Sequence, residues 1–230
     1  MSHPSHPPCT AVRQHQRVFS LLLLLRRAKW TLDTVSTCQL RPPQPGGGQV
    51  GGRASGDVKD SGSSEDSGQA ARRRRRGGGG VEHVWLVLRA ELLHFIHTLL
   101  NHLALAEVHS EWQRFRDQIP YLSDVDAFRR AHDAFADVVA ARCLLQPHFE
   151  PLLERVRGIA ALAIRLRMHL ETHSPQPSSS LLAAAGRWRS ELRASIGSVL
   201  NSLRSEAARS PQSSGLLVEL CRALDFNRFY

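Results

Sequence analysis

Hydrophobic residues recur every three or four positions along much of this chain, a spacing that places side chains on one face of an α-helix. The pattern appears between about His15 and Thr34, and again between about Val81 and Ile119. The apolar positions of these two stretches are Val18, Leu22, Leu25 and Leu32, then Leu88, Leu92, Phe95, Leu99 and Leu103. Pro120 is expected to end the second helix, because proline disrupts the interior of a helix.

Four further helices are predicted in the second half of the chain. Ser123, with Asp126 three residues later, predicts a capping box at the start of the first. Pro147 suits the first turn of the next helix, a third spans about 178–209, and a short one follows Pro211. Their apolar positions are, in chain order, Val125, Phe128, His132, Phe135 and Val139; Phe149, Leu153, Val156, Ile159, Ala160, Leu162, Ala163 and Leu166; Leu181, Ala185, Trp188, Leu192, Ile196, Val199 and Leu203; and Leu216, Leu217, Leu220, Cys221 and Leu224.

No segment shows the sustained alternation and β-branched enrichment that are typical of strands. The fold class is therefore predicted to be all-α. Short loops between consecutive helices favour antiparallel neighbours. We expect an antiparallel helical bundle built from the first helix, residues 15–34, and from residues 81–230.

Two segments contain few residues that could be packed in a core. Residues 1–14 are rich in proline and histidine, and residues 35–80 form a low-complexity stretch of Pro, Gly, Ser and Arg. Such segments cannot offset the entropy lost on ordering. We predict a disordered N-terminus and a disordered insert that loops out between the first two helices.

The chain has 230 residues and a formal net charge of +9. Residues 39–80 carry eight Lys/Arg against four Asp/Glu, so +4 of this charge lies in the predicted insert. The run Arg72–Arg76 suggests an alternative hypothesis, a small helical protein that binds nucleic acid. No aromatic residues are interleaved with the arginines to stack on bases, so an unstructured or regulatory tether is favoured.

The spacing of the cysteines and the length of the apolar run 19–25 indicate the cellular compartment in which the chain is expected. Cys9, Cys38, Cys143 and Cys221 are far apart and show no zinc-ligand spacing, which favours reduced thiols in the cytosol. The apolar run 19–25 is shorter than the roughly 18 residues that a membrane span needs. We expect no targeting sequence and no membrane anchor.

Candidate catalytic and metal-binding residues are few. Glu91, His94 and His97 lie about one turn apart on a predicted helix, but bundle metal sites need ligands from several helices, and no further set is evident. His132 falls inside an apolar stripe, where a hydrogen-bonded core histidine is expected. The glycine-rich stretches lack the lysine and the serine or threonine of a P-loop. The sequence predicts no metal, no cofactor and no enzyme activity.

Several different short motifs follow one another along the chain. As an ordered set they resemble the C-terminal, gamma-tubulin-binding domain of the gamma-tubulin complex components. The resemblance covers the first helix and essentially all of residues 81–230. The motifs are Val18-Phe19-Ser20 through Trp30; Leu88-Arg89-Ala90-Glu91-Leu92-Leu93-His94-Phe95 with Trp112; Asp124-Val125-Asp126 with His132 and Cys143-Leu144-Leu145; and Leu224-Asp225-Phe226-Asn227.

This resemblance implies a non-enzymatic scaffold that binds gamma-tubulin and contributes to microtubule nucleation at microtubule-organizing centres. It implies gamma-tubulin and other gamma-tubulin complex components as partners, and a location in the cytoplasm and cytoskeleton, at the microtubule-organizing centre or spindle pole. GTP would belong to tubulin. Members of the family are far longer, so the chain is expected to be a C-terminal fragment.

Two groups of residues are candidates for partner binding. Trp and Arg dominate interface hot spots, and the first helix carries them beside its apolar face. That apolar face is expected to pack against the second helix, and both roles are possible if the basic residues point outward. The terminal residues are candidates either for partner contact or for closing the bundle. The candidates are Arg26, Arg27, Lys29 and Trp30 in the first helix, and Asp225, Phe226, Asn227, Arg228, Phe229 and Tyr230 at the end of the chain.

Overall fold

The computed structural model describes residues 10–35, 65–172, 179–209 and 214–225, and of residues 65–82, 179, 181 and 214 it describes the backbone alone. Every regular element in these ranges is helical. The elements are α1 (Thr10–Thr34), α2 (Glu65–Asn101), η2 (His102–His109), α3 (Ser110–Gln118), η3 (Ile119–Tyr121), α4 (Val125–Arg142), η4 (Pro147–Phe149), α5 (Glu150–Thr172), α6 (Ser179–Arg209) and α7 (Ser214–Leu224). The predicted all-α class is confirmed.

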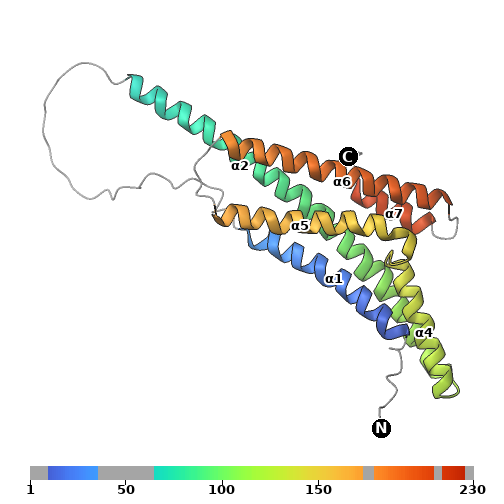
Figure 1. The fold of residues 1–230 in the computed structure, drawn as a ribbon. Coiled ribbons are helices and arrows are strands. Elements are labelled where there is room, and N and C mark those ends of the chain that lie inside the picture. Colours follow the sequence, from blue (N-terminus) through green and yellow to red (C-terminus); the bar gives the residue numbers. More distant parts are fainter. Residues whose placement is uncertain (1–9, 36–64, 173–178, 210–213, 226–230) are drawn as a thin grey trace, which may run out of the picture.

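The helices form a bundle that contains three antiparallel pairs, α1 with α2, α5 with α6, and α6 with α7 (Figure 1). α1 packs against α2, α4 and α5, and α6 packs against α2, α5 and α7. α1 and α5, which are separated in the chain by α2, η2, α3 and α4, run side by side in the same direction. The predicted bundle is thus confirmed, with α1 as an integral member.

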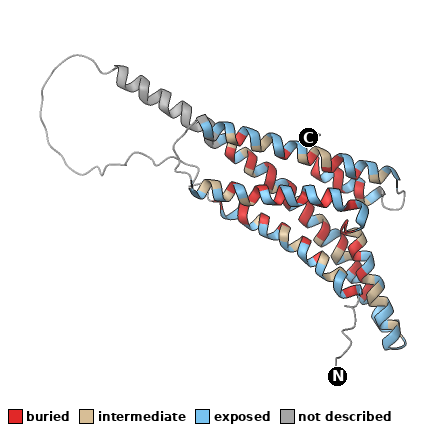
Figure 2. Cartoon of the chain, in the orientation of Figure 1, coloured by how far each residue is buried: buried red, intermediate tan, exposed pale blue. Residues whose placement is uncertain are grey.

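The core lies along the inward faces of these helices (Figure 2). One cluster of buried residues joins all the long helices, which is why α1 cannot be regarded as an appendage. Most of the apolar positions predicted from periodicity are buried, among them Leu25, Leu88, Phe95, Leu166 and Ile196. In the described ranges, no helix is both long and apolar enough to cross a membrane.

The helix limits differ from the prediction at the N-terminal ends. α1 begins at Thr10 and α2 at Glu65, so residues 10–14 and 65–80 are helical although both were assigned to disordered segments. Residues 1–9 and 36–64 lie outside the described residues. Alanine and arginine favour helix, and these residues extend helices whose later turns are held by the core.

The predicted second helix is interrupted. Instead of a single α-helix to Ile119, a π-helix, η2, separates α2 from α3, and both of its flanking residues keep helical dihedrals. α2, η2 and α3 form one continuous helical segment that reaches η3, where Pro120 ends it as expected. The buried positions across η2 step by four residues, Leu99, Leu103, Glu107, Glu111 and Phe115, which fits the wider turn of a π-helix. Because two of these five residues are glutamates, the apolar pattern alone did not show it.

The start of α4 corrects two predictions. The N-cap is Asp124, whose carboxylate accepts a hydrogen bond from the backbone N–H of Ala127 at 2.6 Å; the predicted Ser123–Asp126 capping box was wrong. Val125, predicted on the buried stripe, is 82% exposed, and Phe128 is also exposed. Both lie on the first turns of α4, in the α3–α4 hairpin that extends beyond the bundle (Figure 1). Phe128 contacts α3 there, with its ring 5.8 Å from that of Phe115, centroid to centroid.

α4 ends in a tight turn that redirects the chain into α5. Leu144 adopts a left-handed conformation with φ of 60°, and the N–H of Leu145 donates to the carbonyl of Ala140 at 3.0 Å, as in a Schellman motif. Glycine is usual at such a position. Leucine is accommodated because its side chain is buried in the core.

Candidate partner-binding site

α1 presents two different faces to its surroundings. We call the buried one the inner seam, and its members recur at intervals of three, four and seven residues: Ala11, Val18, Leu21, Leu25, Ala28 and Leu32. The predicted partner-binding residues lie away from it. Arg26, Arg27 and Trp30 are exposed, and Lys29 is half-buried. The first helix therefore packs with one face and leaves the other accessible, as its composition suggested.

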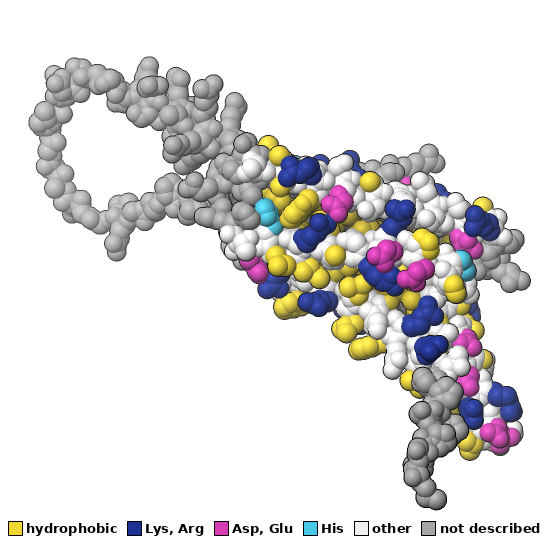
Figure 3. Space-filling model, in the orientation of Figure 1, with side chains coloured by type: hydrophobic (Ala, Val, Ile, Leu, Met, Phe, Trp, Pro, Cys, Tyr) yellow, Lys and Arg dark blue, Asp and Glu magenta, His cyan; other side chains and the backbone are white. Residues whose placement is uncertain are grey.

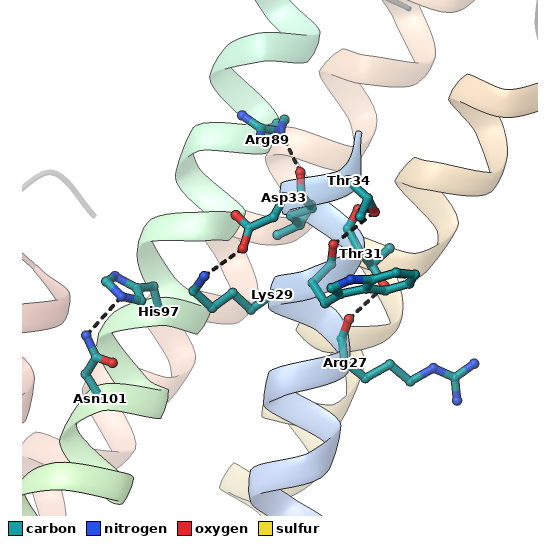
Figure 4. A network of polar contacts seen from close by, with 10 residues as sticks. Arg27, Lys29, Thr31, Asp33, Thr34, Arg89, His97 and Asn101 are labelled. Atoms are coloured by element: carbon teal, nitrogen blue, oxygen red, sulfur yellow. Dashed lines mark hydrogen bonds and ion pairs between the residues drawn. The ribbon is translucent and has the colours of Figure 1, made fainter. Parts of the chain in front are cut away.

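Two side chains of this group are held by neighbours. Lys29 Nζ lies 2.6 Å from Asp33 Oδ2 in an ion pair one turn along the helix (Figure 4). The guanidinium of Arg167 on α5 lies over the Trp30 ring, 5.2 Å from its centroid. A cation–π contact of this kind restrains the indole while leaving most of it open to a partner.

The rotation of α1 about its axis is fixed at both ends. Near its start, the Arg17 guanidinium donates a hydrogen bond to the backbone carbonyl of Leu145 in the turn before α5. Near its end, Arg89 Nε on α2 donates to the carbonyl of Leu32 at 2.8 Å (Figure 4). These bonds reinforce the packing of the inner seam and hold the exposed face outward.

The structure does not bring the two candidate groups together. Asp225, just after α7, is buried, and its Oδ2 accepts a hydrogen bond from Arg204 on α6 at 2.8 Å. α7 packs against α2 and α6, whereas α1 packs against α2, α4 and α5. The remaining terminal candidates, Phe226, Asn227, Arg228, Phe229 and Tyr230, lie outside the described residues. Asp225 serves to fasten the end of α7 to α6.

The Glu91, His94 and His97 group has other contacts. Glu91 is buried, and its Oε1 accepts hydrogen bonds from Arg189 at 2.7 Å and from Arg193 at 3.3 Å. His94 is exposed, and His97 Nε2 lies 3.0 Å from the side-chain amide of Asn101. Among the residues with described side chains, no three His, Cys, Asp or Glu residues are grouped as metal ligands.

His132 lies in an aromatic cluster between α1, α3 and α4. Its ring is within 6.4 Å, centroid to centroid, of His15, Phe115, Phe128 and Phe135, and its Nε2 lies 3.3 Å from His15 Nε2. Burial, and to a lesser degree the charge of His132, lowers the pKa of His15. His132 thus packs as the apolar stripe suggested.

A buried polar cluster beside η2 escaped the sequence analysis. Glu107 is 1% exposed, and its Oε2 accepts a hydrogen bond from Arg142 on α4 at 3.2 Å. Arg142 also lies 3.0 Å from Glu111, which pairs with Arg114 at 2.7 Å. The sequence does carry a sign of this cluster, because Glu107 interrupts an otherwise apolar run. Its partner Arg142 is 35 residues away in the chain, however, so local spacing does not connect the two.

The described cysteines are buried free thiols, Cys143 and Cys221. Burial, helped by the nearby Glu107 carboxylate, raises the pKa of Cys143 to about 12. Burial also raises the pKa of Cys221. Cys9 and Cys38 lie outside the described residues. The two described thiols are therefore packing residues and poor nucleophiles.

His102 should make folding stability depend on pH. Burial lowers its pKa below 6.5, and the carboxylates of Glu107 and Glu219 offset only part of this shift. The unfolded chain then binds the proton more readily, so the stabilisation is complete above about pH 6.5 and is lost as pH falls through the lowered pKa. The midpoint of urea denaturation should fall between pH 7.5 and pH 5.0, and we expect this fall to be smaller in His102→Gln.

The exposed His94 offers the matched control for this measurement. His94→Gln should show the same fall in urea midpoint between the two pH values as the unsubstituted chain does. If His102→Gln showed an undiminished fall, the titration of His102 would not contribute to the pH dependence of folding.

The family is decided by a comparison with protein-family models. The model for the gamma tubulin complex component C-terminal region matches residues 9–230 of this chain. The chain belongs to the gamma-tubulin complex component C-terminal family. The match begins one residue before α1 and includes the whole described bundle, which confirms the family resemblance inferred from the ordered motifs.

Individual members of the family are similar over shorter stretches. Gamma-tubulin complex component 3 of Homo sapiens is 28% identical over 87 residues, 38% of this chain and 10% of that protein. Its Xenopus laevis homolog is 30% identical over 79 residues, 34% of this chain and 9% of that protein. Gamma-tubulin complex component 5 of Mus musculus is 25% identical over 150 residues, 65% of this chain and 14% of that protein. The chain thus matches only a small part of these relatives' length.

Sequence reasoning located one face of α1 and overlooked the regularity of the other. Val12, Phe19 and Leu23 are exposed and lie on the same side as Trp30. Their spacing was available in the sequence. It went unnoticed because a second apolar pattern, the inner seam, runs through the same residues and accounts for helix packing.

Proposed function

We propose that this chain is a non-enzymatic scaffold that binds gamma-tubulin and contributes to microtubule nucleation at microtubule-organizing centres, including the spindle pole. Its partners would be gamma-tubulin and other gamma-tubulin complex components. The observation that carries the proposal is the family match over residues 9–230. Relatives named as gamma-tubulin complex components 3 and 5 support it.

The fold is suited to such a role. A core shared by all the long helices favours a rigid body, and the exposed face of α1 is held outward by contacts with α2, α5 and the turn before α5. Rigid presentation reduces the entropy lost on association. The side chains of Arg72–Arg76, on which the nucleic-acid alternative depends, lie outside the described ones.

The proposed role of α1 can be tested with purified gamma-tubulin. We expect the tagged chain to retain gamma-tubulin, and Arg26→Ala/Arg27→Ala to weaken retention at least tenfold, because interface arginines each contribute substantially to affinity. Co-purification shows whether gamma-tubulin is retained, and titration measures how much more weakly the double variant binds it. The exposed pair Arg129 and Arg130 on α4 supplies the control, and Arg129→Ala/Arg130→Ala should bind within twofold of the unsubstituted chain.

Two results would contradict this proposal at different levels. Retention of gamma-tubulin no better than by an unrelated helical protein would exclude gamma-tubulin binding by this chain. Retention that falls equally in both double variants would leave gamma-tubulin binding intact and remove α1 as its site.

A further inference from the structure

A second regular row of side chains runs along α1, on the side opposite the inner seam. We call it the outer seam: Val12, Gln16, Phe19, Leu23, Arg26 and Trp30. Successive members are separated by alternating steps of four and three residues, the spacing of the a and d positions of a heptad repeat. At 1.5 Å per residue the row is about 27 Å long.

The apolar members of the outer seam are unusually open. Val12, Phe19, Leu23 and Trp30 are each between 46% and 65% exposed. Hydrophobic side chains follow the edge of the molecule over α1, with Lys and Arg side chains beside them (Figure 3). Single exposed apolar residues are common on protein surfaces, but four on one line of a helix, interrupted only by Gln16 and Arg26, indicate an interaction site.

The charge that α1 places beside the outer seam is mostly positive. Between Thr10 and Thr34 there are five basic residues and one acid, Asp33, which is paired with Lys29. In heptad terms Arg13 and Arg27 occupy e positions and are exposed. Side chains at e and g determine which helix a coiled-coil helix accepts, so the favoured partner carries acids at its own flanking positions.

We propose that the outer seam docks an α-helix of another protein whose apolar heptad positions are flanked by Asp and Glu. Phe19, Leu23 and Trp30 would pack between its apolar side chains, while Arg13 and Arg27 would pair with its acids. The inference rests on the proposed function only in taking α1 as a partner-binding helix. Binding of gamma-tubulin is not required for it.

A helical partner fits this face better than a membrane or a second copy. The apolar residues of the outer seam lie within about 20° of one line on the helix, whereas helices that lie in a membrane interface present a broad apolar face. A second copy would place Arg13 and Arg27 of both chains along the same interface. Like charges at flanking positions oppose such pairing.

The test uses a 28-residue synthetic peptide with Leu at a and d and Glu at e and g, carrying a fluorescent label. Its own glutamates oppose self-pairing, so the free peptide remains available. We expect its fluorescence anisotropy to rise saturably on addition of the whole chain. A peptide with Lys in place of every Glu should bind at least tenfold more weakly, and added salt should weaken binding of the Glu peptide.

Matched variants assign the binding to the outer seam. Phe19→Ala/Leu23→Ala should weaken binding of the Glu peptide at least tenfold. Leu182→Ala/Val218→Ala removes comparable exposed apolar side chains from α6 and α7 and should bind within twofold of the unsubstituted chain. Arg13→Glu/Arg27→Glu should reverse the preference, so that the Lys peptide becomes the tighter ligand. Circular dichroism of each variant confirms that the bundle is folded.

Several outcomes would overturn the proposal. They are no saturable binding of the Glu peptide, equal binding of both peptides, or equal loss in both double-alanine variants. Seam-dependent binding to phosphatidylserine vesicles without peptide binding would assign the outer seam to a membrane instead. Seam-dependent dimerisation would assign it to a second copy. None of these measurements involves gamma-tubulin, so they are independent of the co-purification result.

Discussion

Leu25→Asp is expected to unfold the bundle, whereas Leu23→Asp, two residues earlier on the same helix, is expected to leave it folded. Leu25 belongs to the inner seam and is 0% exposed, while Leu23 belongs to the outer seam and is 52% exposed. Loss of the buried leucine costs about 2–3 kcal/mol, and an unpaired buried carboxylate costs several kcal/mol more. That sum rivals the whole stability of a typical domain, about 5–15 kcal/mol.

Urea or thermal denaturation followed by circular dichroism measures both effects. Leu25→Asp should abolish the cooperative transition or lower its midpoint steeply. Leu23→Asp should change the free energy of unfolding by only about 0.5 kcal/mol, the difference in helix propensity. Equal effects of the two substitutions would show that α1 is rotated differently from the structure, or that it does not pack on the bundle.

Arg142→Leu should lower the free energy of unfolding by about 3 kcal/mol. Arg142 lies 3.2 Å from Glu107 and 3.0 Å from Glu111, and both carboxylates are almost inaccessible to water. Glu111 keeps Arg114 as a partner, but removing the cation leaves the buried charge of Glu107 uncompensated, which typically costs 3–5 kcal/mol. We expect a cost at the lower end of this range, because the Arg142 side chain is itself partly exposed. Urea denaturation at pH 7.5 supplies the measurement.

A compensating variant separates charge from packing. Arg142→Leu/Glu107→Leu should recover at least half of the lost stability, because no charge is then stranded at Glu107. Arg157 forms exposed ion pairs with Glu150 and Glu154, so Arg157→Leu should cost less than about 1 kcal/mol. A cost for Arg142→Leu as small as that of Arg157→Leu would mean that the buried cluster contributes little to stability.

The helical faces could be predicted from the sequence because helix burial follows a period near 3.6 residues. In α5, Leu153, Val156, Ala160 and Ala163 were all predicted on the apolar face and all are buried. In α4 the same reasoning failed at Val125 and Phe128. Periodicity shows which residues share a face, but it does not show where along a helix the neighbouring helices end.

The candidate site was predictable only in part. Arg26, Arg27 and Trp30 were identified from residue type, and the structure places all three on the exposed face of α1. Asp225 was identified with them, yet its carboxylate is engaged by Arg204. A carboxylate near the end of a chain can bind a partner or a neighbouring helix equally well by its chemistry, and only the position of α6 distinguishes the two.

The sequence by itself determined the all-α class, the family, and the apolar faces of the helices, because each depends on residue type and on spacing along a single segment. The tertiary structure decided which of the two seams of α1 enters the core, that α1 and α5 run in the same direction, and that Glu107 meets Arg142. These features depend on contacts between residues far apart in the chain. Local spacing carries no information about which distant helix will lie alongside.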